Sequence, residues 1–171
     1  TGACGIYFGK RHPYNTSTTV AGKAINSYRA ELQAVRLLVV GTKTWEEKLW
    51  VTLDNAAVVH DVNEYINGSA TKPKVDNNDI WQDLAPELVR QAQQGRLRCT
   101  WTKGHATNDD ITAGKATPEE RERNKKADEL ADDGQKLHDR CPYIPRAAKQ
   151  RTQIAILQQT MLIKVVLERK R

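Results

Sequence analysis

The order of its secondary-structure patterns predicts that this chain has an α/β fold, with helices on both faces of a mixed sheet. Two strand-like segments come first and are separated by a turn, as in an antiparallel hairpin. Helical and strand-like segments then alternate, which indicates parallel strands joined by helices. With 171 residues, 39% hydrophobic and 28% charged, the chain is long enough for one domain with a sizeable core.

Each predicted strand is short and rich in apolar, aromatic or β-branched residues. The turn after the first strand is indicated by His12-Pro13-Tyr14-Asn15, and the third strand ends at Asp54. The four predicted strands are residues 3–9, 16–21, 49–53 and 97–102.

The predicted helices are indicated by apolar residues at helical spacing and by their end signals. Gly41 ends the first helix, and Asn67-Gly68 ends the second. Pro86 is the point at which the third would divide. Thr117-Pro118-Glu119-Glu120 starts the fourth with an N-cap threonine and a first-turn proline. These helices are residues 27–40, 55–66, 78–94 and 117–134.

The composition divides the chain into a domain over residues 1–139 and a basic linker with a helical extension over residues 140–171. The net charge of +6 belongs to the extension, which has eight basic residues and only Glu168 as an acid. Such a tail could bind a phosphate backbone or an acidic domain; the alternative is a solvated helix face. An apolar stripe predicts a final amphipathic helix: Ile154, Leu157, Met161, Leu162, Val165 and Val166.

The cysteines and the hydropathy pattern favour an intracellular protein, cytoplasmic or nuclear. Cys4, Cys99 and Cys141 are odd in number and far apart, which is typical of reduced thiols. No apolar run is long enough for a membrane span, and no signal-peptide pattern opens the chain.

Three carboxylates and one histidine stand at the ends of predicted elements. Glu31 lies early in a helix, Asp54 ends a strand, His105 follows a glycine in a loop, and Asp128 lies on the last helix of the domain. Converging carboxylates repel one another unless a cation neutralises them, and hard oxygen ligands favour Mg²⁺ or Mn²⁺. Two such ions can promote phosphodiester hydrolysis, and a histidine can relay the proton.

Each of these residues also has an ordinary structural explanation when it is considered alone. Glu31 and Asp128 could be solvated helix charges, His105 a surface loop residue, and Asp54 the N-cap of the following helix. The joint pattern of four residues in this order of elements favours a catalytic site.

Four motifs resemble those of the type I ribonuclease H family, including its members in retroelement polyproteins. The similarity covers residues 3–135 and rests on one set of segments: Arg29-Ala30-Glu31-Leu32, Leu53-Asp54-Asn55, Lys103-Gly104-His105-Ala106 and Asn124 to Ala131. It implies a five-stranded mixed sheet and an endonuclease that hydrolyses the RNA strand of RNA–DNA hybrids with two Mg²⁺ ions, for which Mn²⁺ can substitute.

The resemblance also implies a role for individual residues. Glu31, Asp54 and Asp128 would be metal ligands, and His105 would assist the water and product steps. The substrate-binding residues that the resemblance implies are Asn26, Ser27 and Asn124. Trp81 matches an apolar anchor of the family near its substrate handle, with a core tryptophan as the alternative.

The chain departs from the family at its N-terminus. The family begins with a strand that ends in a metal-binding Asp. Thr1-Gly2-Ala3-Cys4 resembles that motif with Thr in place of Asp, but we prefer a register in which residues 3–9 are the second strand. The first strand and its Asp then lie upstream of Thr1, on a precursor, on another chain or in another segment.

We therefore expect a ribonuclease H domain of a reverse-transcribing element, with an RNA–DNA hybrid as substrate and a polymerase domain, or a chain that supplies the strand, as partner. The alternative is a catalytically impaired module that binds nucleic acid or scaffolds an assembly, as the missing Asp and the long tail favour. An integrase or resolvase of the same superfold fits poorly, because these motifs are not theirs.

Overall fold

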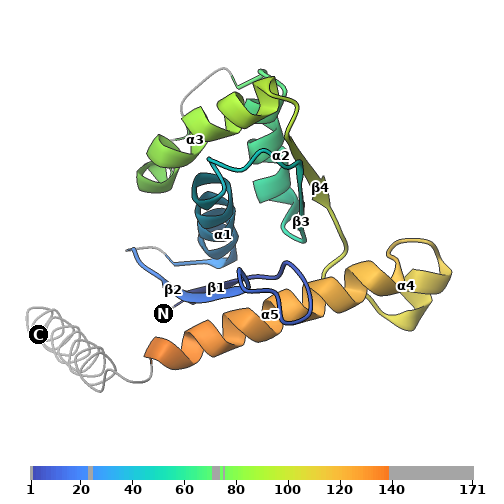
Figure 1. Cartoon of the computed structure of the whole chain (residues 1–171). Coiled ribbons are helices and arrows are strands. Elements are labelled where there is room, and N and C mark those ends of the chain that lie inside the picture. The colour runs from blue at the N-terminus through green and yellow to red at the C-terminus, as the bar shows by residue number, and fades with distance from the viewer. Residues whose placement is uncertain (1, 23–24, 71–73, 75, 139–171) are drawn as a thin grey trace, which may run out of the picture. The chain divides into compact units, whose positions relative to one another are not determined.

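The computed structural model describes residues 2–22, 25–70, 74 and 76–138 (Figure 1). The expected final helix therefore lies outside the described residues. The strands are β1 (Gly2–Ile6), β2 (Thr16–Val20), β3 (Leu49–Leu53) and β4 (Leu97–Trp101). The helices are α1 (Ser27–Gly41), α2 (Ala56–Ile66), α3 (Asn78–Gln93), α4 (Asn108–Thr112) and α5 (Pro118–His138).

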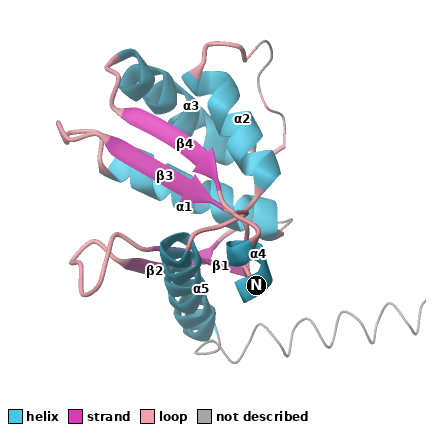
Figure 2. Cartoon of the chain, turned by 90° about the vertical axis from the view of Figure 1, so that its right-hand side faces the viewer, coloured by secondary structure: helices cyan, strands magenta, loops and turns pink. Residues whose placement is uncertain are grey.

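The four strands of the described residues pair in twos (Figure 2). β1 and β2 are antiparallel, with Gly2 opposite Val20, and β3 and β4 are parallel, with Leu49 opposite Leu97. The α/β class, the hairpin and the mixed strand directions are thus confirmed. A single continuous sheet is not present among these residues.

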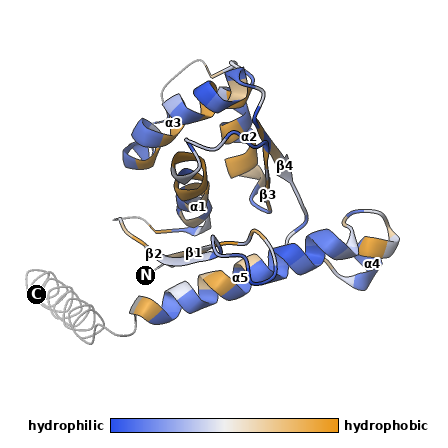
Figure 3. Cartoon of the chain, in the orientation of Figure 1, coloured by the Kyte–Doolittle hydropathy of each residue, from blue (hydrophilic) through white to orange (hydrophobic). Residues whose placement is uncertain are grey.

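The larger core lies where α1, α2 and α3 pack on β3 and β4. Leu32, Val58 and Leu84 are fully buried there, one from each helix. Trp81 is 3% exposed and stacks on Tyr65 at a centroid distance of 5.1 Å, so it is the core tryptophan of the two alternatives. Apolar residues accordingly dominate α1 and α2, whereas α5 is mostly hydrophilic (Figure 3).

The hairpin is packed between two helices. Cys4 is buried beside Ala34 of α1, whereas the next residue, Gly5, faces α5. A Cβ at Gly5 would lie 2.2 Å from the Ala127 carbonyl oxygen, so only glycine permits this approach. Because successive residues of a strand point to opposite faces, α1 and α5 cover opposite faces of β1.

Arg29 fixes the start of α1, the helix that carries Glu31. Its guanidinium is buried and pairs with Asp79 at the start of α3, donates to Asn77 Oδ1 over 2.8 Å, and donates to the Ala21 carbonyl over 2.9 Å. A planar guanidinium can satisfy all of these acceptors at once, which an ammonium cannot.

The structure differs from the predicted elements at four places, of which the first is β1, which ends at Ile6 and not at residue 9. α3 runs through Pro86 without dividing, and it begins after Asn77, which has a left-handed φ of 59°. The short α4 lies in the segment expected to be a loop, where Thr107 and Asp110 form a capping box. α5 continues to His138, one turn past the expected end. Gly134 therefore does not end the helix but lies within it, where it packs closely against the backbone of Thr18.

We predict that Leu88→Ala lowers the free energy of unfolding by about 2–5 kcal/mol, because Leu88 is fully buried and its loss leaves a cavity. Leu137→Ala is the matched control, since Leu137 is 45% exposed and should change stability by less than about 1 kcal/mol. Urea denaturation measures both. Equal losses for the two variants would contradict this description of the core.

Candidate active site

Asp54 directly follows the last residue of β3. Its side chain lies near Glu31 of α1 and Asn124 of α5. The alternative role of Asp54 as a helix N-cap is wrong. Asn55 caps α2 instead, because its Oδ1 accepts from the backbone N–H groups of Ala57 and Val58 at 3.1 and 3.3 Å. The Asp54 carboxylate is therefore available for another partner.

Glu31 meets Asp54 from α1. The Glu31 carboxyl is in hydrogen-bond contact with the Asp54 carboxylate and accepts from the backbone N–H of Asn55. Two carboxyl groups can share a hydrogen bond only if one carries a proton. The raised pKa of Glu31 places that proton on Glu31 in the metal-free protein at neutral pH.

The third carboxylate and the histidine approach from α5 and from the loop after β4. Asp128 Oδ2 lies 3.7 Å from His105 Nδ1. Asn124, one turn earlier on α5, places its amide nitrogen 3.4 Å from Asp54 Oδ2 and 3.5 Å from Asp128 Oδ2. The structure thus brings together the four residues expected to be catalytic, with Asn124 between two of the carboxylates.

The loop that carries His105 is held by contacts on both sides. A Cβ at Gly104 would lie 2.5 Å from Asp54 Oδ2, so glycine is required for the close approach to the carboxylate. His105 itself has a left-handed φ of 48°, and its side chain is 86% exposed. Lys103 donates to Asp110 over 2.8 Å, which ties the loop to α4. Sequence reasoning missed Asp110, although Thr107-x-x-Asp110 has the spacing of a capping box.

The electrostatics of the site follow from the crowding of acids. Burial, then the hydrogen bond and charge of Asp54, raise the pKa of Glu31 to about 8, although the Asn55 N–H lowers it in part. Burial also raises the pKa of Asp128, which His105 opposes and the charge of Asp54 reinforces. Burial and the neighbouring carboxylate therefore disfavour the ionised form of both Glu31 and Asp128.

Two of the expected substrate-binding residues lie beside this site at the start of α1. Asn26 is the N-cap of α1, and its side chain accepts from the Arg29 N–H over 2.8 Å. Ser27 is exposed and lines the same cavity as Glu31 and Asp54. The contact of Asn26, Ser27 and Asn124 with a substrate stays a prediction.

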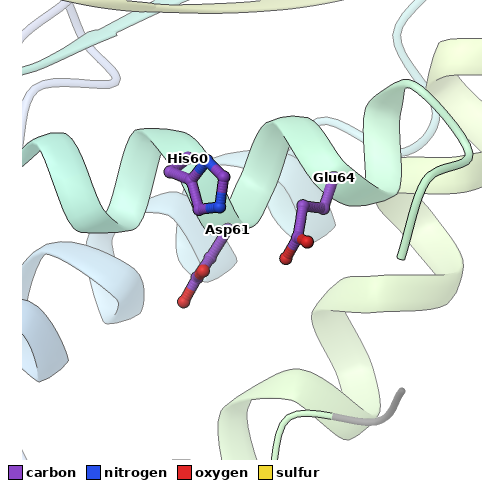
Figure 4. A group of neighbouring side chains, drawn as sticks. All are labelled: His60, Asp61 and Glu64. Atoms are coloured by element: carbon purple, nitrogen blue, oxygen red, sulfur yellow. The ribbon is translucent and has the colours of Figure 1, made fainter. Parts of the chain in front are cut away.

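A second group of possible metal ligands lies on α2 (Figure 4): His60, Asp61 and Glu64, whose ligand atoms are within 4.8 Å of one another. This group is already neutralised. Lys74 Nζ lies 2.8 Å from Asp61 and 2.5 Å from Glu64, and the Tyr28 hydroxyl donates to Asp61 over 2.5 Å. The ammonium group of Lys74 occupies the position that a metal ion would take on α2. We therefore favour the group of Glu31, Asp54 and Asp128 as the metal centre.

The donor set at Glu31, Asp54 and Asp128 has the chemistry that a hard divalent cation prefers, although, among the described residues, only the group on α2 has all of its ligand atoms within 4.8 Å of one another. All three groups offer carboxylate oxygens, and the imidazole nearby is exposed and can exchange protons with water. A cation there would displace the proton of Glu31 and would offset the burial and the charge of Asp54 that raise the pKa of Glu31.

One comparison with known proteins gives a match to a family. A protein-family model described as RNase H matches residues 1–136, which is most of the chain. A search of curated proteins gives no match. In addition, no helix among the described residues is long and apolar enough to cross a membrane.

We predict that Glu31→Gln stabilises the metal-free protein at alkaline pH. The pKa of Glu31 is raised from 4.5 to about 8 on folding, so its contribution to the free energy of unfolding falls as pH rises through that range. Glutamine cannot ionise, and the variant should gain on the order of 2 kcal/mol at pH 9, after allowance for solvent screening.

Urea denaturation with a chelator between pH 4 and 9 measures this difference. Glu119→Gln on the exposed start of α5 is the control and should follow the wild-type curve. A Glu31→Gln variant that is no more stable than the wild type at pH 9 would show that the carboxylates do not interact as described.

Proposed function

The chain belongs to the RNase H family, whose members are nucleases that act on RNA–DNA hybrids, and we propose that this chain is a metal-dependent endonuclease of that kind. The observation that carries the proposal is the convergence of Glu31, Asp54 and Asp128 from three separate elements, beside His105. A structural copy of the fold has no need for three repelling carboxylates at one point.

The chemistry assigns a task to each group. Two Mg²⁺ ions, or Mn²⁺ in their place, would supply an activated water and stabilise the leaving oxygen of the RNA strand. Asp54, at the end of β3, does not cap α2, so its carboxylate is free to be a metal ligand. Glu31 would lose its proton to become a second ligand. Asp128 would be the third ligand, and His105, 3.7 Å from it and exposed, can carry a proton between the reacting groups and bulk water.

Recognition of the hybrid would come from the residues at the start of α1 and α5. Ser27 is exposed and lines the carboxylate cavity together with Asn124, and Asn26 is the exposed residue just before Ser27. Amide and hydroxyl groups can bind the 2′-hydroxyl of RNA, which DNA lacks. We thus infer selectivity for the RNA strand, by shape and sugar contacts with little base reading.

The motif resemblance supports a wider setting in a reverse-transcribing element, with a polymerase domain as partner. The buried free thiols Cys4 and Cys99 support an intracellular location. Burial raises the pKa of both thiols, to about 11 and about 12, so both would resist oxidation.

One observation favours the second candidate, an impaired module that binds or scaffolds. The described residues supply three carboxylates and two separate strand pairs, whereas the family pattern has a further strand that ends in Asp. Binding without cleavage would be the expected behaviour of such a module.

The first prediction for this function concerns Asp54. With Mg²⁺, the chain should cleave an end-labelled RNA–DNA hybrid and leave duplex DNA intact, and Asp54→Asn should slow cleavage at least about 100-fold because a ligand charge is lost. Glu64→Gln, in the second acidic group, is the control and should retain cleavage. Equal rates for wild type and Asp54→Asn would exclude the proposed centre, and hybrid binding without cleavage would favour the impaired module.

The second prediction concerns His105. His105→Ala should lower kcat by about 100-fold or more while the KM for the hybrid changes little, because the imidazole moves protons and does not hold the substrate. His60→Ala, on the exposed side of α2, is the matched control. A large rise in KM with unchanged kcat would reassign His105 to substrate binding.

A further inference from the structure

Four aromatic rings gather at the turn between β1 and β2. Phe8 stacks on His12 at a centroid distance of 5.1 Å, and Tyr14 lies 5.0 Å from Trp45, which comes from the loop between α1 and β3. Phe8 also contacts Tyr14 and Trp45, so the four rings form one aromatic cluster (Phe8, His12, Tyr14 and Trp45). Contacts between rings account for the position of Phe8, whereas Tyr14 is 54% exposed and presents aromatic surface to solvent.

The turn that carries three of these rings is held in one shape. The Asn15 side chain accepts from the Phe8 N–H and donates to the Gly9 carbonyl, both over 2.8 Å. Arg11 has a left-handed φ of 57°, which is uncommon for a residue other than glycine. The rings are therefore positioned in advance of any ligand, and the exposed Lys10 and Arg11 of the same turn add positive charge.

A cavity of about 370 Å³ adjoins the aromatic cluster, because Trp45 belongs to both. Basic residues dominate its charge: Lys43, Arg90 and Arg96 line it, against a single acid, Glu46. The cavity therefore offers positive charge directly beside an aromatic surface.

Arg96 is the basic residue of this cavity with a donor left over. Its Nε is buried and has no hydrogen-bond partner among the described residues, whereas Arg90 is paired with Glu87 and donates to the Lys43 carbonyl over 2.6 Å. A buried donor without an acceptor costs free energy, and guanidinium groups bind phosphate oxygens with such donors. The cavity thus has the chemistry of a phosphate site.

This region lies at the other end of β3 from the carboxylates. Trp45 precedes β3 and Asp54 directly follows it, so the length of a five-residue strand, roughly 15 Å, separates the two ends. The turn after β1 and the loop before β3 lie on the same side of the molecule (Figure 2). The aromatic cluster and its cavity are therefore distinct from the proposed metal centre.

We propose that the aromatic cluster and the adjoining cavity bind single-stranded nucleic acid. A base stacks on Tyr14 and Trp45, and a phosphate of the same strand binds Lys43 and Arg96. Aromatic rings beside a basic groove bind single strands, and stacking tolerates any base. A duplex is excluded, because its bases are already stacked inside the helix. This site goes beyond the proposed nuclease function and does not depend on it.

A titration of the full chain with an oligothymidylate of about 12 nucleotides tests the proposal. Fluorescence anisotropy of a labelled strand measures affinity. A chelator keeps metal from the carboxylates, and DNA is used because the proposed nuclease acts on RNA. Residues 140–171 are basic and would bind phosphate without stacking, so each result is a comparison between variants of the full chain.

The aromatic contact is tested at Tyr14. Tyr14→Ala should weaken binding by at least about fivefold, because a stacked base loses its ring. Trp50→Ala is the matched control, since Trp50 is 66% exposed and lies outside the aromatic cluster, and it should bind as the wild type does.

Stacking on Trp45 has its own signal, the quenching of tryptophan fluorescence by the bound strand. Trp45→Phe should abolish this quenching and keep the affinity within about twofold, because phenylalanine also stacks on bases.

The phosphate contact is tested at Arg96. Arg96→Gln should weaken binding and reduce the slope of log affinity against log salt by about 0.7, the contribution of one phosphate contact to a single strand. Arg96→Lys retains the charge and should retain the slope. Arg36→Gln is the control, because the Arg36 guanidinium is already paired with Asp83.

Three results would overturn the proposal. The first is an oligonucleotide that binds without quenching Trp45, with equal affinity for Tyr14→Ala, which would assign binding to residues 140–171. The second is equal affinity for thymidine monophosphate, which would make the cavity a site for free nucleotides. The third is no oligonucleotide binding but quenching of Trp45 by a peptide of about ten prolines, which would assign the rings to a proline-rich partner.

Discussion

The repulsion among three carboxylates is the constraint on which the functional part of this molecule depends. Glu31, Asp54 and Asp128 come from α1, the end of β3 and α5, so the packing of three elements is needed to force them together. In the absence of a cation, burial and then the hydrogen bond and charge of Asp54 raise the pKa of Glu31 to about 8, so protonation of Glu31 relieves part of the repulsion. The fold therefore holds a site whose charge is balanced only when something positive binds.

The rest of the fold can be understood as support for that arrangement. Arg29 ties the start of α1 to α3 and so fixes the helix turn that carries Glu31. Gly104 allows the loop after β4 to pass against Asp54, and Asp110 anchors the same loop through Lys103. Because these contacts involve backbone approach and buried charge, small changes at them would move the site as a whole.

Much of this could be predicted from the sequence, for physical reasons that differ between residues. Apolar spacing located α1 and α2, the start signal at Thr117-Pro118 located α5, and the end of a strand located Asp54, since all of these depend on local patterns. Asn55 as the N-cap, the passage of α3 through Pro86 and the contact of Gly5 with α5 were not predictable, because tertiary packing decides them. The site residues themselves came from motifs, whereas their distances came only from the structure. The ion pairs of Lys74 with Asp61 and Glu64 of α2 had no sequence signal, since the tertiary structure and not a local pattern brings Lys74 to that helix.

The most direct test of the metal centre is the broadening of backbone NMR signals by Mn²⁺, a paramagnetic ion. Substoichiometric Mn²⁺ should first broaden the signals of residues next to Glu31, Asp54 and Asp128, and Mg²⁺ in excess should restore them. Broadening confined to His60, Asp61 and Glu64, or none at all, would contradict the assignment of the carboxylates of α1, β3 and α5 as the metal site.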